Sequence, residues 1–432
     1  MSTSLLNCAI LLSREIGDYW ESTSSGTGST VTVVDSALIA KPNDWITDVT
    51  YDLITSGSNN GEERKVSTTS LLTSGTYIVG THGTTTFGSV TYQLHRLFEP
   101  SEKRRALITA AANIFGVCYD LVWDESVVSG NWIKDGSFER WSNGTSLTNW
   151  SASAIVATQG SAAGLFKHGG YSALLTGTLG SVSQGIAQFE DLKYLAGKNV
   201  LFSAQGWCNT ASCLRLSVYD GTTRTYSSYH GGGSAWTQDN PRNDSFYVQA
   251  NLSYNPTEVT FQVHHEIAGG TSYIDDARVI SGYRDRLFIR QLGLAKDQPS
   301  QIFIEPTYYS QQEPWLEIHD WEVDEDGYLH LPTSVPNDYR LRIVGKQYLD
   351  FLASGTASTA WAATINLDAP QTEILAAEAA VYLYTWMSMP NYESGTREDY
   401  QGMIGYWKEE AKRRKAKFGM TPLPSVVSWG HG

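Results

Sequence analysis

The residues best suited to chemistry are the adjacent His264 and His265, followed by Glu266. Imidazole and carboxylate groups are common metal ligands. These three residues, however, end the alternating segment EVTFQVHHE (258–266), which predicts a β-strand. Successive side chains of a strand point to opposite faces of a sheet. The two histidines are therefore predicted to have structural roles, because they cannot chelate one metal ion together.

A second candidate is the acidic stretch from Glu305 to Asp326, which contains eight carboxylates and no Lys or Arg. Two of them could act as a glycosidase pair, but no spacing singles out a pair. A solvated face or a subunit contact is the preferred interpretation. The sequence also lacks G-x-S-x-G, H-E-x-x-H, Walker A and dinucleotide-binding motifs. We therefore predict that the protein is not an enzyme.

A third candidate is the basic segment KEEAKRRKAK (408–417), with two Glu and six Lys or Arg. It could contact phosphates in a DNA-bearing channel. It could equally be the solvated face of an amphipathic helix, which is the more common arrangement. DNA is therefore a predicted partner only if this chain lines a channel.

The composition excludes several classes of protein. The net charge is −14, which argues against a nucleic-acid surface over the whole chain, and aromatic residues make up 12%, which argues against a large disordered protein. Four cysteines do not make a disulfide framework, and Cys208 and Cys213 are interpreted as free thiols. The apolar run near the N-terminus is too short for a membrane span, so no membrane partner is predicted.

The elements that must position these residues fall into three zones. Residues 1–98 alternate strand-like runs with turns, and Glu99-Pro100-Ser101-Glu102 predicts a helix at about 100–115. Residues 282–432 begin with strand-like runs, and Asp368 caps a predicted helix with Gln371 at the capping-box position. Pro390-Asn391 is predicted to break this helix, and a longer helix with Tyr400, Met403, Trp407, Ala411 and Phe418 on one face follows.

The middle zone differs, because short strand candidates recur there between closely spaced turn signals. This pattern predicts an all-β sandwich at 129–281. The fold class is therefore α+β and mostly β: a discontinuous strand-and-helix domain, 1–128 and 282–432, interrupted by the sandwich.

The ends of the sandwich carry a resemblance. NWIKDGSFE (131–139) followed by Trp150, and YIDDARV (273–279), resemble the opening and closing strands of carbohydrate-binding-module-like jelly rolls. In many such modules, a Glu of the opening strand and an Asp of the closing strand hold a structural calcium ion. The resemblance thus implies a calcium site at Glu139, Asp275 and Asp276. The alternative is that these carboxylates bind a loop without metal. No other cofactor is predicted.

Sugar binding would need aromatic platforms on one exposed face. Trp207, Tyr226, Tyr229 and Trp236 are the candidates, because the stretch TYSSYHGGGSAW (225–236) is predicted to be an accessible loop. Host-surface glycans are the partner that the resemblance implies.

The flanking zones show a looser resemblance. TVVDSAL (32–38), Asp44-Trp45 and the helix after YQLHRLF (92–98) resemble virion proteins of tailed bacteriophages. The segments AAEAAVYLYTW (376–386) and YWKEEAKRRKAKFGM (406–420) resemble the helices with which head–tail connector, neck and adaptor proteins form rings. The resemblance implies a homo-oligomeric ring in the virion, assembled in the host cytoplasm, with portal, neck or tail subunits as partners. Trp407, Arg413 and Arg414 are predicted at the oligomer interface.

A different class of function stays open. The chain could instead be a carbohydrate-active enzyme, or a secreted sugar-binding protein, with an appended carbohydrate-binding module. The missing catalytic motifs and the placement of the sandwich inside the chain favour the virion hypothesis.

Overall fold

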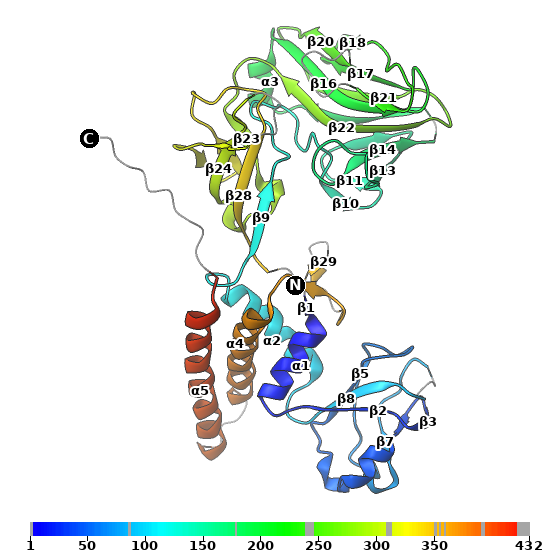
Figure 1. Cartoon of the computed structure of the whole chain (residues 1–432), viewed down its shortest axis with the longest axis vertical. Coiled ribbons are helices and arrows are strands. Elements are labelled where there is room, and N and C mark those ends of the chain that lie inside the picture. The colour runs from blue at the N-terminus through cyan, green and yellow to red at the C-terminus, as the bar shows by residue number, and fades with distance from the viewer. Residues whose placement is uncertain are drawn as a thin grey trace, which may run out of the picture. The chain divides into compact units, whose positions relative to one another are not determined.

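The computed structural model describes residues 3–84, 88–177, 179–237, 246–307, 313–349, 352–353, 356–357, 360–389 and 394–420. Most of its elements are strands, and the chain divides into two compact units (Figure 1). One unit comprises Met1–Asp120 and Tyr348–Gly432, and the other comprises Leu121–Gln347. None of the helices in the described ranges combines the length and apolar character needed to cross a membrane.

Four helices form the helical part of the first unit. They are α1 (Leu5–Glu15), α2 (Pro100–Asn113), α4 (Ala369–Ser388) and α5 (Ser394–Phe418). The predicted helices at 100–115 and after Asp368 are confirmed. The predicted cap is present, because the amide of Asp368 donates to Oε1 of Gln371 at 3.1 Å. The predicted helix break at Pro390 lies outside the described residues.

Helix α1 was not predicted, although the sequence carries a signal for it. Leu5, Cys8 and Leu12 recur at helical spacing and are buried, at 0%, 2% and 0% exposure. The hydroxyl of Ser4 accepts the amide of Asn7 at 3.1 Å and caps the helix. The strand-like texture of the following residues obscured this helix.

The rest of the first unit is β-structure with a separate hydrophobic core. One sheet has the order β2 (Trp20–Thr23), β8 (Thr91–His95), β5 (Tyr51–Ile54) and β6 (Glu63–Lys65). A second has the order β3 (Gly26–Ser29), β4 (Thr32–Val34) and β7 (Thr76–Ile78). Two small pairings complete it, β1 (Thr3–Ser4) with β31 (Thr364–Ile365) and β29 (Leu352–Ala353) with β30 (Thr356–Ala357).

The second unit contains a β-sandwich. One sheet has the order β12 (Ser151–Ser153), β15 (Gly180–Ile186), β21 (Val259–His265), β17 (Leu214–Tyr219) and β18 (Arg224–Tyr226). The other has the order β13 (Val156–Gly160), β14 (Ser172–Thr176), β22 (Thr271–Ile280), β16 (Asn199–Cys208) and β19 (Ala235–Trp236), with β20 (Tyr247–Asn251) also paired to β16. The sheets share one core, in which the rings of Phe202 and Phe261 lie 5.6 Å apart. The hairpin β10 (Trp141–Asn143)–β11 (Ser146–Leu147) and helix α3 (Phe189–Leu195) flank it.

A smaller β-module with its own core completes the second unit. One of its sheets has the order β25 (Leu316–Glu317), β24 (Pro299–Ile304), β28 (Leu341–Gln347) and β9 (Asp120–Asp124). The other has the order β23 (Arg286–Phe288), β27 (Tyr328–His330) and β26 (Glu322–Val323). The structure thus divides the chain differently from the predicted 1–128, 129–281 and 282–432. Residues 282–347 fall in the same unit as the sandwich, and within this unit β9, which precedes the sandwich, joins the sheet of β24 and β28, which follow it.

Candidate functional site

The outward-pointing side chains of β17, β18 and β21 form a polar and aromatic surface, which we call the outer face. Apolar residues of these strands alternate with them and point into the core. The strand register places Arg215 opposite His264, Ser217 opposite Gln262, and Ser217 opposite Tyr226. Outer-face residues are Arg215, Ser217, Tyr219, Arg224, Tyr226, Thr260, Gln262 and His264.

Two tyrosines are held in place at one end of this face. Tyr226 is 43% exposed and Tyr229 is 46% exposed. The guanidinium carbon of Arg215 lies 3.9 Å from the centre of the Tyr226 ring and 5.0 Å from that of Tyr229. The same Arg215 donates to Glu266 at 2.6 Å, and the Tyr229 hydroxyl donates to Glu266 at 2.9 Å. We call Tyr226, Arg215, Tyr229 and Glu266 the tyrosine clamp, because each member orients the next.

His264 supplies a neutral polar group beside the clamp. Its ring lies 5.6 Å from the ring of Tyr226, and its Nε2 lies 2.8 Å from the hydroxyl of Ser217. Burial lowers the pKa of His264 to about 4, so the imidazole is uncharged near pH 7. The structure confirms that His264 and His265 point to opposite faces: His265 is buried, with Nδ1 2.8 Å from the hydroxyl of Ser272.

The four aromatic residues predicted to bind sugar do not form one site. Trp207 and Trp236 face each other across β16 and β19 of the other sheet. The ring of Trp207 packs edge-on against Tyr273 at 5.3 Å, and the indole of Trp236 donates to the carbonyl of Gly164 at 2.8 Å. Tyr226 ends β18 of the five-stranded sheet, and Tyr229 lies in the loop that follows it. The prediction of one four-residue platform is therefore wrong, because the residues belong to opposite sheets.

Arg215 and Glu266, which orient the tyrosines, were not predicted as site residues. The alternation of apolar and polar residues in CLRLSVYDG (213–221) places Arg215 on the same strand face as Tyr219. The contact between Arg215 and Glu266 depends on which strand lies beside β17. The sequence does not specify this strand order, so the contact could not be predicted.

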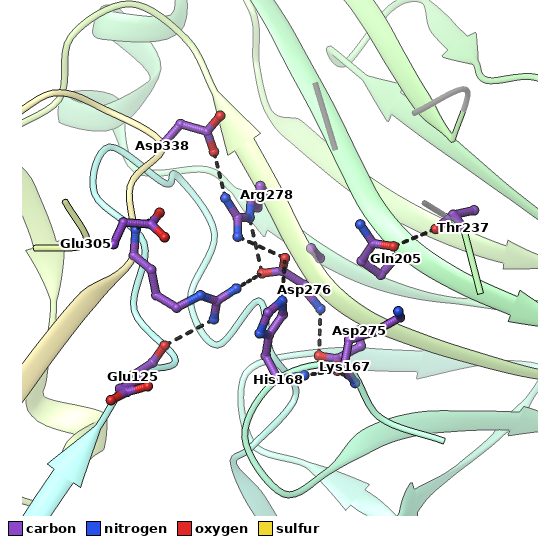
Figure 2. A network of polar contacts seen from close by, with 12 residues as sticks. Glu125, Lys167, His168, Gln205, Thr237, Asp275, Asp276, Arg278, Glu305 and Asp338 are labelled. Carbon is purple, nitrogen blue, oxygen red and sulfur yellow. Dashed lines mark hydrogen bonds and ion pairs between the residues drawn. The ribbon is translucent and has the colours of Figure 1, made fainter. Parts of the chain in front are cut away.

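The predicted calcium ligands Asp275 and Asp276 lie on β22 and belong to a buried network of charges (Figure 2). Asp276 accepts from Arg278 at 2.9 and 3.1 Å and from Arg340 at 3.1 Å. Arg278 also donates to Asp338 at 3.1 Å. Burial would raise the pKa of Asp276, but the two guanidinium groups outweigh this effect and lower it. Asp276 is thus already neutralised by cations.

Glu139 and Asp275 bind one loop of backbone. Asp275 accepts the amides of Lys167 and His168 at 2.6 and 3.0 Å, and Glu139 accepts those of Gly170 and Tyr171 at 3.1 and 3.0 Å. Burial raises the pKa of both carboxyl groups. Among the described residues, no group of three or more His, Cys, Asp or Glu side chains is arranged to hold a metal ion. The contacts fit the alternative of carboxylates that bind a loop, and they do not fit calcium held by all three residues.

The predicted interface residues of α5 are placed differently from one another. Trp407 is 3% exposed and lies in the core of the helical part. Arg414 donates to Glu15 of α1 at 2.9 Å and to the carbonyl of Glu373 at 2.8 Å. Only the side chain of Arg413 is largely exposed, at 64%. Trp407 and Arg414 therefore stabilise their own chain, which corrects their assignment to an oligomer interface.

Comparison with known proteins gives no family assignment. No family model and no curated protein matches the chain. Among solved structures, TmCBM61 in complex with β-1,4-galactotriose is 17% identical, covering 36% of this chain and all of that one, with a TM-score of 0.27. The CBM22-1 xylan-binding domain from Paenibacillus barcinonensis Xyn10C is 14% identical over 37% of this chain and 99% of that one, also at 0.27.

A third solved structure is a phage protein. The enzymatically active domain of bacteriophage CBA120 tailspike protein 4 is 13% identical, covering 35% of this chain and 22% of that one, with a TM-score of 0.27. TM-scores this low carry no argument about function, so the functional proposal does not rest on these three structures.

Proposed function

We propose that the sandwich binds glycans on its outer face and that the tyrosine clamp is the centre of this site. The observation that carries the proposal is the pair of exposed tyrosine rings fixed by Arg215 and Glu266. An aromatic ring offers an apolar surface to the C–H groups of a sugar, and its fixed orientation reduces the entropy lost on binding. Gln262 and neutral His264 offer hydrogen-bonding groups beside the rings.

At the level of the whole chain, we propose a non-catalytic structural subunit of a tailed-phage virion, with a neck or head–tail adaptor ring as the specific position. The sandwich would then be a jelly roll that decorates the particle. Support comes from the resemblance of the flanking segments and from apolar side chains exposed on α4 and α5. These are Trp386 at 41%, Met389 at 65%, Met403 at 37% and Tyr406 at 59% exposure. Apolar side chains exposed on helices suit association with further subunits.

The glycan proposal is tested by incubating the full chain with a microarray of neutral and acidic oligosaccharides. Retention of a defined set of glycans without their cleavage is the expected result. Retention of none would contradict glycan binding, and cleavage of a bound glycan would contradict the non-catalytic role.

The assembly proposal has a separate test, the native mass of the full chain in solution. A closed oligomer is expected. A monomer at every concentration would contradict a ring subunit while leaving the glycan proposal intact.

A further inference from the structure

A cavity of about 310 Å³ lies within the second unit, between the opening turn of the sandwich and the β23–β27 sheet. Its wall includes Lys134, Asp191, Arg284, Phe288, Gln291 and Tyr328. The volume falls at the lower limit for small-molecule sites, which suits a ligand of about one sugar ring. The cavity is separate from the outer face, and none of its residues was predicted from the sequence.

Two cations of this wall are held by aromatic rings. The Lys134 ammonium lies 4.0 Å from the centre of the Phe288 ring, and the guanidinium carbon of Arg284 lies 4.0 Å from that of Trp132. A ring attracts a cation without cancelling its charge. Within the described part of the chain, the ammonium of Lys134 has no hydrogen-bond acceptor. Among the residues that the structure describes, the one carboxylate within 4 Å of the Arg284 guanidinium is that of Asp191, at 3.9 Å, which is beyond hydrogen-bonding distance. Both groups therefore retain donors for a ligand.

The charge balance of the wall limits the kind of ligand. Lys134 and Arg284 oppose one carboxylate, Asp191. Asp135 also borders the cavity, but its two carboxylate oxygens accept the amides of Glu139 and Arg140. Among the described residues, no carboxylate lies within hydrogen-bonding distance of either cation, whereas Asp191 and Asp135 together limit the positive charge of the wall. This arrangement matches a singly charged carboxylate better than a doubly charged phosphate.

The remaining wall suits a hydroxylated ring. The Oε1 of Gln291 accepts from Asn149 at 3.0 Å, which leaves its amide nitrogen as a donor. Asp191 offers carboxylate oxygens to hydroxyl groups, and Tyr328 adds an aromatic ring with a hydroxyl group to the wall. We propose that this cavity binds a small hydroxylated carboxylic acid of the uronic acid type, with its carboxylate between Lys134 and Arg284.

The test measures binding of galacturonate, galactose and inorganic phosphate to the full chain by calorimetry. Galacturonate is expected to bind and galactose to bind at least about tenfold more weakly, because only the acid meets the cations. Lys134→Gln should weaken galacturonate binding by about tenfold or more, whereas Lys134→Arg should restore most of it. Lys65→Gln, an exposed lysine of the first unit, is the matched control and should change nothing.

The variant Tyr226→Ala distinguishes binding in the cavity from binding on the outer face. It should leave galacturonate binding unchanged. Equal affinity for galactose and galacturonate would overturn the proposal. So would phosphate binding without galacturonate binding, the failure of galacturonate to bind, or a folded Lys134→Gln protein with unchanged affinity.

Discussion

At the scale of single residues, Asp276 is the centre of the buried charge network in Figure 2. Asp276→Asn should destabilise the second unit by about 3–5 kcal/mol, because it leaves two buried guanidinium groups without their shared carboxylate. The backbone of Asp276 has φ of 48°, which Asn tolerates as well as Asp, so the loss reports the charge and not backbone strain.

Chemical denaturation of the full chain measures this effect. Asp285→Asn is the control, because the side chain of Asp285 is half exposed, at 50%. An Asp276→Asn protein with the same denaturation midpoint as the wild type would show that the network contributes no net stability.

The raised pKa of Asp135 predicts how the stability of the second unit changes with pH. Burial raises its pKa to about 7, whereas an unfolded aspartate has a value near 3.8. The folded state therefore holds its proton more tightly, so the stability that Asp135 contributes falls as pH rises from about 4 to about 7. The loss is on the order of 4 kcal/mol at most, at about 1.4 kcal/mol for each unit of pKa.

The measurement is the free energy of unfolding between pH 4 and pH 8. Asp135→Asn should reduce the slope with which the free energy of unfolding falls as pH rises. Part of the slope should remain, because burial also raises the pKa values of Asp275 and Glu139. The exposed control Asp285→Asn should leave the slope as it is. A slope identical in wild type and Asp135→Asn would contradict the assignment of a raised pKa to Asp135.

At the scale of elements, adjacent arginines of α5 have different roles. Arg414 is 11% exposed at its side chain and joins α5 to Glu15 of α1, whereas within the described residues Arg413 donates its hydrogen bonds to Glu410 on its own helix. Arg414→Glu should therefore lower the stability of the first unit by roughly 2 kcal/mol or more, since it places like charges together in a partly buried position.

Arg413→Glu is the matched control and should leave the denaturation midpoint within experimental error. Equal effects of the two reversals would contradict the placement of Arg414 against α1.

The sequence predicted α2 and α4, whose ends are encoded locally, although the local signal of α1 was missed. Pro100 at the start of α2 and the cap formed by Asp368 and Gln371 are short-range signals, and both were interpreted correctly. The stripe containing Trp407 was recognised, but the sequence does not say whether such a stripe packs on its own chain or on a neighbour. In the structure Trp407 and Ala411 are buried in the core of their own chain, with Tyr400 and Phe418 packed against it, whereas Met403 is exposed.

At the scale of the whole molecule, strand order explains what the sequence did not predict. The sandwich was expected from its short strands, but Trp207 and Tyr226 lie close in sequence and end on opposite sheets. The Lys134 cavity also combines residues far apart in the chain, such as Arg284 and Tyr328. No local pattern encodes these long-range pairings.

Binding of an oligosaccharide to the intact chain is the most direct test of the outer-face site. The measurement compares the dissociation constants of wild type, Tyr226→Ala and Tyr247→Ala for one glycan retained on the microarray. Tyr247 is the matched control, because it is a strand tyrosine of similar exposure, 41% against 43%, on the other sheet. We predict that Tyr226→Ala weakens binding by about tenfold or more and that Tyr247→Ala leaves it unchanged. Unchanged binding by a folded Tyr226→Ala protein would contradict glycan recognition on the outer face.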